Sequence, residues 1–347
     1  MIRLSARFLS AVALVALFVP VIQAVAQQHV PPAPDTGAQQ APSAPGSTAA
    51  QPGNAPSAPA PSPAPVFPKL DPANFTAPSP TKEVVDAFLQ ASWGYDDNRV
   101  WQVQAILKTP AEGVSKVIVL VADKTGKEKP AAASFLALPD GKHIIAGDQI
   151  IDFGAQPFAN YRQQLQQRAD GPYRGSASKE LELVEFYDFQ CPHCKEAQAN
   201  MDKLAVDFPK ARIVFQNFPI ASIHPQSVIA AEYGLCVSKL GGSTAFFQFA
   251  AAVFDGQDGL ATSDGATLTL NSAVTKAGLD PAKVSACAAT PEIKAAVDAS
   301  IKLTEDLGIN QVPMLVINGR EVPTTAPYDT LKKIVEYQAK TDGVALQ

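Results

Sequence analysis

Two cysteines, Cys191 and Cys194, stand between two segments of different pattern. Residues 181–187 form an apolar run that predicts a buried strand, and a helical stretch follows from Lys195. A cysteine at the start of a helix lies beside free backbone N–H groups and the positive end of the helix dipole, which favour a thiolate. Because the two cysteines are three residues apart, their sulfurs share one helical face. The segment therefore predicts an α/β fold that presents two cysteines for thiol–disulfide exchange.

The two cysteines have different expected roles. Cys191 at the helix start should be the exposed, attacking thiol with a lowered pKa, whereas Cys194 lies deeper and resolves a mixed disulfide. His193 adds an imidazole near the sulfur that favours the anion, and Pro192 suits the first helical turn because its missing N–H costs nothing there. Stabilising the thiolate stabilises the reduced form, so the disulfide should be an oxidant.

A zinc site or a purely structural bridge is the main alternative for a C-x-x-C motif. A zinc site would need a second cysteine pair at ligand spacing, but Cys236 and Cys287 are far apart and neither belongs to a C-x-x-C. We therefore expect neither a metal nor a cofactor. A net charge of −5 without a basic cluster also argues against nucleic-acid partners.

Residues 1–26 have the pattern of a secretory signal peptide. Arg3 and Arg7 precede an apolar run that ends in the small residues 24–26, and Pro20 interrupts this run. The run is shorter than the roughly 20 residues that a membrane-spanning helix needs. We expect cleavage and export to an oxidising compartment, where cysteines tend to be paired. An uncleaved N-terminus, which would tether the protein to a membrane, is the alternative.

The next segments differ in composition. Residues 27–80 are dominated by Pro, Ala, Gln, Ser and Gly, and predict a disordered tether because they cannot bury enough surface to offset their ordering entropy. Residues 81–155, with a helix start at Thr81 and later strand runs separated by turn signals, predict a small α+β domain. Residues 156–178 predict a connecting helix and a loop.

The last segment, residues 179–347, carries the cysteine pair. Its expected order is strand, helix, strand, a helical insertion, strand and helix, over residues 181–187, 192–208, 212–218, about 224–308, 313–317 and about 328–340.

Residues 185–194, Glu-Phe-Tyr-Asp-Phe-Gln-Cys-Pro-His-Cys, resemble the DsbA-type thiol–disulfide oxidoreductases, which are thioredoxin-fold proteins of the bacterial periplasm. The resemblance continues through Phe218-Pro219-Ile220 with His224-Pro225 and through Gln311-Val312-Pro313. It covers about residues 181–340. It implies a thioredoxin fold with a helical insertion and a periplasmic enzyme that oxidises cysteine pairs of folding proteins.

The resemblance also implies roles for single residues. Val312 and Pro313 match the family's cis-proline loop, which lies against the active-site sulfurs. Glu185 matches a buried acid beneath the cysteine pair that can handle the proton of Cys194, and an acid in an apolar strand is otherwise costly to bury. Asp188 departs from the apolar or small residue expected there, and its charge would make the protein a milder oxidant.

Two more positions lie in the helical insertion. Cys236 and Cys287 match a structural disulfide of related proteins, although two buried free thiols remain the alternative. His224 precedes a proline at a predicted helix start, which favours a helix-initiating or loop role over catalysis.

The implied partners are reduced or misoxidised exported proteins and a quinone-linked membrane reoxidase. Two alternatives stay open. Residues 132–154 weakly resemble the dimerisation domain of DsbC-like isomerases, which would imply a dimeric isomerase or reductase, a homodimer through the N-terminal domain and a reductase partner. The dipeptide Pro192-His193 and the valine before Pro313 oppose this alternative. The second alternative is a non-catalytic periplasmic binding module in which the cysteine pair is structural.

Overall fold

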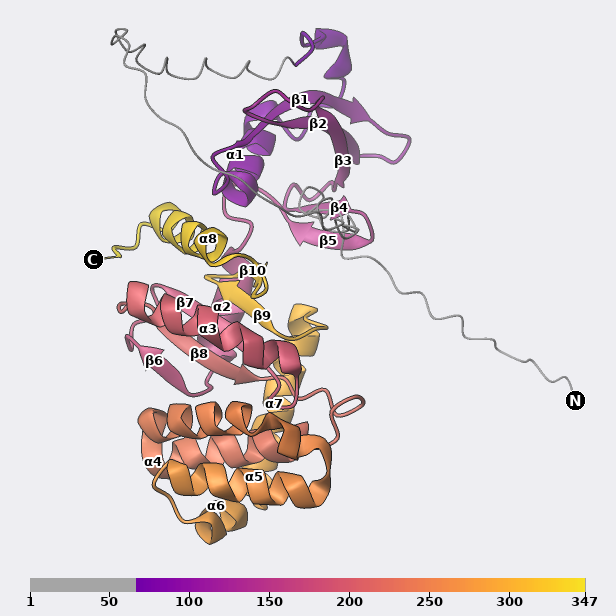
Figure 1. Cartoon of the computed structure of the whole chain (residues 1–347). Coiled ribbons are helices and arrows are strands. Elements are labelled where there is room, and N and C mark those ends of the chain that lie inside the picture. The colour runs from indigo at the N-terminus through magenta and orange to yellow at the C-terminus, as the bar shows by residue number, and fades with distance from the viewer. Residues whose placement is uncertain (1–66, 347) are drawn as a thin grey trace, which may run out of the picture.

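The computed structural model describes residues 67–346, which form two domains with a separate β-sheet each (Figure 1). The predicted signal peptide, residues 1–26, and residues 27–66 of the predicted tether lie outside the described part of the chain. Within the described residues, no helix is both long enough and apolar enough to cross a membrane.

The predicted tether ends earlier than residue 80. Pro72–Asn74 forms a 3-10 helix, η1, whose first turn is capped by the carboxylate of Asp71. Phe75 then pairs with Ile106 and packs against the core of the N-terminal domain. The tether prediction is therefore wrong for this stretch, because its last residues supply a cap and an aromatic ring that the domain can bury.

One helix and an antiparallel meander make the N-terminal domain, which is the predicted small α+β unit. The elements are α1 (Lys82–Trp93), β1 (Arg99–Lys108), β2 (Ser115–Asp123), β3 (Ala131–Ala137), β4 (His143–Ala146) and β5 (Gln149–Asp152), and the strands are neighbours in that order. The side chain of Thr81 caps α1 by accepting a hydrogen bond from the backbone N–H of Val84. Phe88 on the apolar face of α1 packs against Phe135 and Phe153.

The second domain has a five-stranded sheet in the order β10-β9-β7-β8-β6. Its elements are α2 (Ala159–Arg168), β6 (Tyr173–Gly175), β7 (Glu182–Tyr187), α3 (Pro192–Asp207), β8 (Arg212–Asn217), α4 (Ser227–Asp255), η2 (Gln257–Ala261), α5 (Ser263–Lys276), α6 (Pro281–Ala288), α7 (Pro291–Leu307), β9 (Met314–Ile317), β10 (Arg320–Pro323) and α8 (Tyr328–Thr341). Strands β7 and β8 are parallel, so the chain between them must cross over the sheet, and helix α3 makes this crossover and covers one face of the sheet. Both strands are buried at every residue. The predicted thioredoxin fold with a helical insertion is confirmed.

Helices cover both faces of this sheet. Leu183 and Ile213 of the central strands pack with residues of α3 and α8, whereas Val184 and Val214, one residue along, pack with residues of α2 and α7. This alternation follows from the two-residue period of a strand. The helices of the insertion, drawn in orange, lie at the end of the domain away from the N-terminal domain (Figure 1).

Two short strands of the second domain were absent from the sequence prediction. Tyr173–Gly175 was expected to belong to a connecting loop, but it forms the edge strand β6, antiparallel to β8. The turn at Asn318-Gly319, with positive φ at both residues, continues into β10. Both segments are short edge strands that contain arginine with glycine or proline, so neither shows the apolar pattern of a strand.

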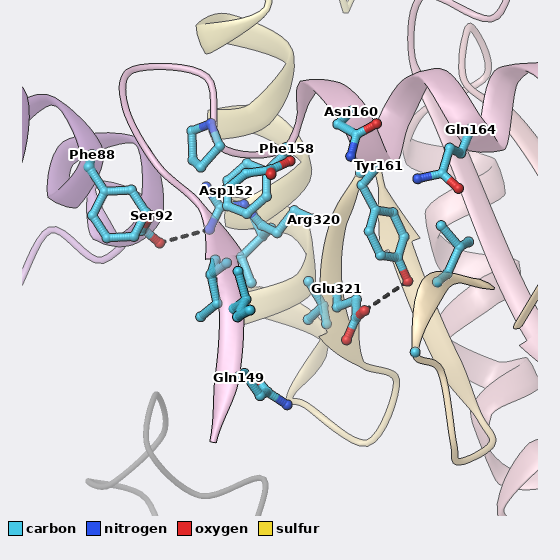
Figure 2. A pocket seen from close by; sticks show the side chains of 18 of the residues that line it. Phe88, Ser92, Gln149, Asp152, Phe158, Asn160, Tyr161, Gln164, Arg320 and Glu321 are labelled. Carbon is cyan, nitrogen blue, oxygen red and sulfur yellow. Dashed lines mark hydrogen bonds between the residues drawn. The ribbon is translucent and has the colours of Figure 1, made fainter. Parts of the chain in front are cut away.

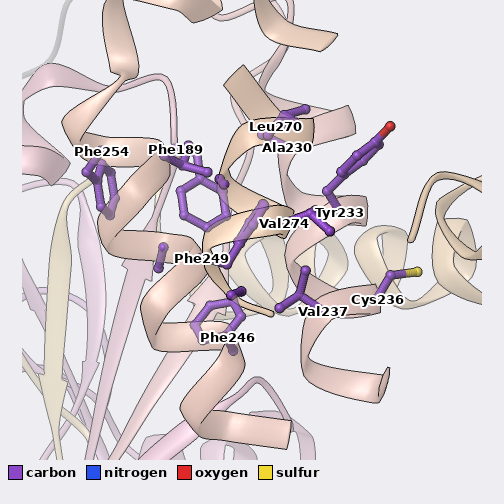
Figure 3. Packing of buried hydrophobic residues seen from close by; sticks show 14 of the residues in the cluster. Phe189, Ala230, Tyr233, Cys236, Val237, Phe246, Phe249, Phe254, Leu270 and Val274 are labelled. Atoms are coloured by element: carbon purple, nitrogen blue, oxygen red, sulfur yellow. The ribbon is translucent and has the colours of Figure 1, made fainter. Parts of the chain in front are cut away.

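Aromatic residues fill the core of the helical insertion (Figure 3). Helix α4 is interrupted at Gly242, whose φ of 77° and ψ of −177° are not helical, and the two parts of α4 pack against α5. Phe189, which precedes the cysteine pair in the sequence, inserts between these helices. Its ring centroid is 5.7 Å from that of Phe249 and 5.3 Å from that of Phe254. The insertion therefore holds the loop that leads into α3.

Arg320 joins the two domains. Its guanidinium is buried and donates hydrogen bonds to the carbonyl oxygens of Ala91 and Ser92 at the C-terminus of α1, where the last carbonyls have no helical partner. The same group lies 4.3 Å from the ring centroid of Phe158 (Figure 2). A cavity of about 650 Å³ lies beside it, between β5, β10 and α2, and contains none of the four C-x-x-C residues.

Candidate active site at the start of helix α3

Cys191 is the N-cap residue of α3, and Pro192 is its first helical residue. The backbone of Cys191 is extended, with φ of −77° and ψ of 121°, and its carbonyl accepts hydrogen bonds from the backbone N–H groups of Cys194 and Lys195. Both cysteines are free thiols in this structure. Strand β7 and the loop 188–190 thus place Cys191 at the start of a helix, as the sequence pattern predicts.

The two thiols have opposite acidities. The pKa of Cys191 is lowered from 9.0 to about 6, first by a hydrogen bond from the Cys194 thiol, then by the backbone N–H groups of Cys194 and His193, and last by the charge of His224, while burial opposes the shift. The pKa of Cys194 is raised well above its ordinary value, first by burial and then by the hydrogen bond to Cys191 and its charge. The site therefore holds one stabilised thiolate above one protonated thiol.

Cys191 is less exposed than expected. Only 6% of its surface is accessible, against none for Cys194. Its sulfur lies 3.9 Å from the carbonyl oxygen of Val312, which belongs to the loop before β9. The peptide bond between Val312 and Pro313 is cis. Because this loop lies against the Cys191 sulfur, it covers part of the thiol.

His193 acts mainly through its backbone. Its side chain is 67% exposed, and its Nδ1 atom lies 3.1 Å from a carboxylate oxygen of Glu196. The hydrogen bond with Glu196 raises the pKa of His193, and the charges of Glu196 and Cys191 act in the same direction. By reciprocity, an imidazolium at this position favours the thiolate. The sequence prediction named the imidazole, whereas the backbone N–H of residue 193 is a direct donor to the sulfur.

Asp188 and His224 form a second polar cluster beside the cysteine pair. The carboxylate of Asp188 is fully buried, and its Oδ2 atom lies 2.8 Å from Nδ1 of His224 and accepts a hydrogen bond from the backbone N–H of Ile220. The backbone of Asp188 also reaches both sulfur-bearing residues, because its N–H faces the Cys194 sulfur at 3.4 Å and its carbonyl accepts from the N–H of Cys191.

This cluster changes two expectations. Asp188 was expected to oppose the Cys191 thiolate, but its carboxylate is paired with His224 and with backbone donors, and the pKa of Cys191 is lowered. His224 was assigned a helix-initiating or loop role, yet its charge contributes to the lowered pKa of Cys191. The two residues are 36 positions apart in the sequence, so no local sequence pattern could have predicted their contact.

Glu185 is a fully buried acid on β7. Its Oε1 atom accepts a hydrogen bond from the side-chain amide of Gln198, which also donates to the carbonyl of Cys194, while its Oε2 atom has no partner among the described residues. Burial raises the pKa of Glu185 to about 8, and Arg174 and Gln198 oppose this shift. Near neutral pH, Glu185 is therefore a protonated acid whose titration is coupled to Cys194.

Replacing Glu185 by glutamine is expected to change how stability depends on pH. An acid with a folded-state pKa near 8 and an unfolded value of 4.5 loses stability as pH rises between these values, by up to about 1.4 kcal/mol per pH unit. In the oxidised protein, where the cysteine pair does not titrate, the unfolding free energy of Glu185→Gln should lack this decline. The exposed Glu305→Gln is the matched control. Parallel pH profiles for Glu185→Gln and the wild type would contradict the assignment.

The remaining cysteines are bonded to each other. Cys236 of α4 and Cys287 of α6 form a disulfide with their Cα atoms 5.9 Å apart. Among the described residues, no group of three or more histidine, cysteine or acidic side chains is arranged to hold a metal ion. The N-terminus of α3 thus presents two free thiols, on which the charges of Glu185 and His224 act.

Comparisons with known proteins find one matching family model and a set of similar solved structures. Residues 167–337 match the family model described as thioredoxin. A thioredoxin-like oxidoreductase from Silicibacter pomeroyi DSS-3 is 26% identical, with a TM-score of 0.44, and the alignment covers 52% of this chain and 98% of that one. The thiol-disulfide exchange protein alpha-DsbA2 from Wolbachia pipientis is 23% identical, with a TM-score of 0.44 and coverage of 51% and 95%.

A curated relative shares a shorter stretch. The Na(+)/H(+) antiporter NhaA 3 of Salinispora tropica is 31% identical over 91 residues, which is 26% of this chain and 14% of the antiporter. The alignment thus spans about a seventh of that relative's length.

Proposed function

We propose, from the premise that residues 167–337 form a thioredoxin-family domain, that the chain is a thiol–disulfide oxidoreductase that oxidises cysteine pairs of exported proteins. The observation that carries the proposal is the unequal pair at the start of α3, where Cys191 is held as a thiolate and Cys194 as a buried thiol. A stabilised thiolate favours the reduced form, and hence makes the Cys191–Cys194 disulfide an oxidant.

The reaction starts from the disulfide form. A substrate thiolate attacks the Cys191 sulfur, the bond between Cys191 and Cys194 breaks, and Cys194 leaves and takes up a proton. Glu185, protonated near neutral pH, can supply that proton. The second substrate thiolate then attacks the substrate sulfur of the mixed disulfide and releases Cys191 as a thiolate. Two electrons pass from the substrate to the cysteine pair, and the substrate gains one disulfide.

The low pKa of Cys191 assists the last step. A thiol of lower pKa is a better leaving group, so release of Cys191 from the mixed disulfide is fast. The cis-proline loop at Val312 and Pro313 lies against the Cys191 sulfur and would offer backbone groups to the substrate segment around its cysteine. The low pKa supports oxidation of a partner protein over reduction, and the loop supports exchange with a partner protein.

The proposal also includes export of the protein and the partners with which it exchanges disulfides. The basic and apolar pattern of residues 1–26 supports secretion to the periplasm, where disulfides persist. The substrates would be reduced or misoxidised exported proteins, and the reduced enzyme would be reoxidised by a quinone-linked membrane partner. A dimeric isomerase would instead rearrange scrambled disulfides efficiently and oxidise reduced substrates poorly, so the two assays side by side separate these directions.

Alkylation of the reduced protein tests the proposal directly. The rate of iodoacetamide reaction at Cys191 should rise with an apparent pKa near 6, because only the thiolate reacts. At pH 7 about 90% of this thiol would be ionised, against a few per cent for a thiol of ordinary pKa. Cys194 should stay unreactive in the folded protein, and Cys191→Ser identifies the reacting residue. A titration of Cys191 near pH 8.5 would refute the proposed oxidase.

A further inference from the structure

Gln257 links the helical insertion to the loop that carries Cys191. It is the first residue of η2, separated only by Gly256 from Asp255 at the end of α4, and it is buried. The side-chain amide nitrogen donates to the carbonyl oxygen of Phe189 at 2.8 Å and to that of Cys191 at 2.9 Å. A glutamine amide has two N–H donors, so these two carbonyls use its full donor capacity.

Other contacts hold the same loop from the same side. The side-chain amide of Gln190 donates to the carbonyl of Leu260 at 3.0 Å, and its oxygen accepts from the backbone N–H of Gln226 at 2.8 Å. The ring of Phe189 lies in the aromatic core of the insertion (Figure 3). Loop residues 189–191 are therefore fixed to both ends of α4, and Gln257 alone among these contacts binds the residue that bears the reactive sulfur.

On the basis of the proposed exchange reaction, we propose that Gln257 is a positioning residue for Cys191. By holding the carbonyls on both sides of Gln190, its amide fixes the extended backbone of Cys191 at the N-cap of α3 and so keeps the sulfur in line with the N–H groups of the first helical turn. Hydrogen bonds to a thiolate depend steeply on direction, so a loose N-cap residue makes them only part of the time.

The expected effect of Gln257 on the pKa of Cys191 does not come from a charge. Gln257 is uncharged, and the titratable groups that act on the Cys191 sulfur come from α3 and from the loop before α4, namely Cys194, His193 and His224. The buried carboxylate of Asp188 is directed at His224. Removing the amide of Gln257 therefore leaves every neighbouring charge in place and changes only how firmly the loop is held.

Gln257→Met tests the proposal, because methionine has similar length and no donor. In the full chain, the apparent pKa of Cys191 measured by alkylation should rise by about one unit, and the equilibrium constant with glutathione should become up to about tenfold less oxidising. The matched control is Gln216→Met. Gln216 is also buried, with hydrogen bonds to Ser300 and to the N–H of Gly171 rather than to the redox loop.

The outcomes separate this proposal from the one it rests on. A low pKa of Cys191 in the wild type, raised in Gln257→Met and unchanged in Gln216→Met, supports the positioning role. A low pKa that stays the same in Gln257→Met, or rises equally in Gln216→Met, overturns the role of Gln257 and leaves the oxidase proposal standing. An ordinary pKa in the wild type overturns the oxidase proposal itself.

Discussion

Replacing Cys191 by serine is expected to reduce dithiol oxidation to the uncatalysed rate. The proposed reaction passes through a mixed disulfide on this sulfur, and a serine hydroxyl can neither form that bond nor leave from it. The measurement is the loss of free thiols in a reduced, unfolded substrate protein that is incubated with the oxidised enzyme. Full activity in Cys191→Ser would instead support the non-catalytic binding module.

Cys194→Ser is the informative partner variant. It keeps the Cys191 sulfur but lacks the thiol that resolves the mixed disulfide. When this variant is incubated with a substrate protein that carries a disulfide, the Cys191 thiolate attacks one substrate sulfur, the substrate disulfide breaks and the other substrate sulfur leaves as a thiolate. A covalent complex should then accumulate through Cys191, because no Cys194 thiol is present to release the substrate. Mass spectrometry of the non-reduced complex identifies the bonded residue. Cys194 is completely buried, whereas Cys191 keeps some exposure, so a complex bonded through residue 194 in Cys191→Ser would reverse the assigned roles.

Local sequence signals predicted the centre of the site well. The strand, the C-x-x-C motif and the helix are contiguous, so period, spacing and helix-start chemistry determine their arrangement together. Strands β7 and β8 were also predicted, because parallel strands that are buried on both faces have largely apolar sequences. The boundaries of α3 and α8 differ from the predicted helices by one residue at the C-terminus.

The residues whose roles were not predicted from the sequence make long-range contacts. The side chain of His224 contacts Asp188, which lies 36 residues away, and that of Gln257 contacts the Cys191 carbonyl, which lies 66 residues away. Only the packed insertion brings these two side chains beside the cysteine pair. A glutamine after an apolar helix resembles many solvated helix ends. Arg320 is similar, since nothing near it in sequence indicates that it caps a helix of the other domain.

The largest expected effect on stability comes from the disulfide between Cys236 and Cys287. It joins α4 to α6 and closes a loop with a sequence separation of 51 residues. In the chain-entropy model, a loop of this length constrains the unfolded state by about 4 kcal/mol, and measured values for disulfides are typically about 2–4 kcal/mol. The double variant Cys236→Ala/Cys287→Ala should therefore unfold at a clearly lower urea concentration than the wild type.

Cys236 is completely buried in the core that also holds Phe189, so the double variant has a second expected effect. If the insertion loosens, the loop before Cys191 loses part of its support, and the pKa of Cys191 should rise in the direction expected for Gln257→Met. The matched control is Cys191→Ala/Cys194→Ala, which removes the other cysteine pair and keeps the bond between α4 and α6. An unchanged urea midpoint in Cys236→Ala/Cys287→Ala would show that the packed aromatic core, rather than the covalent link, holds the insertion together.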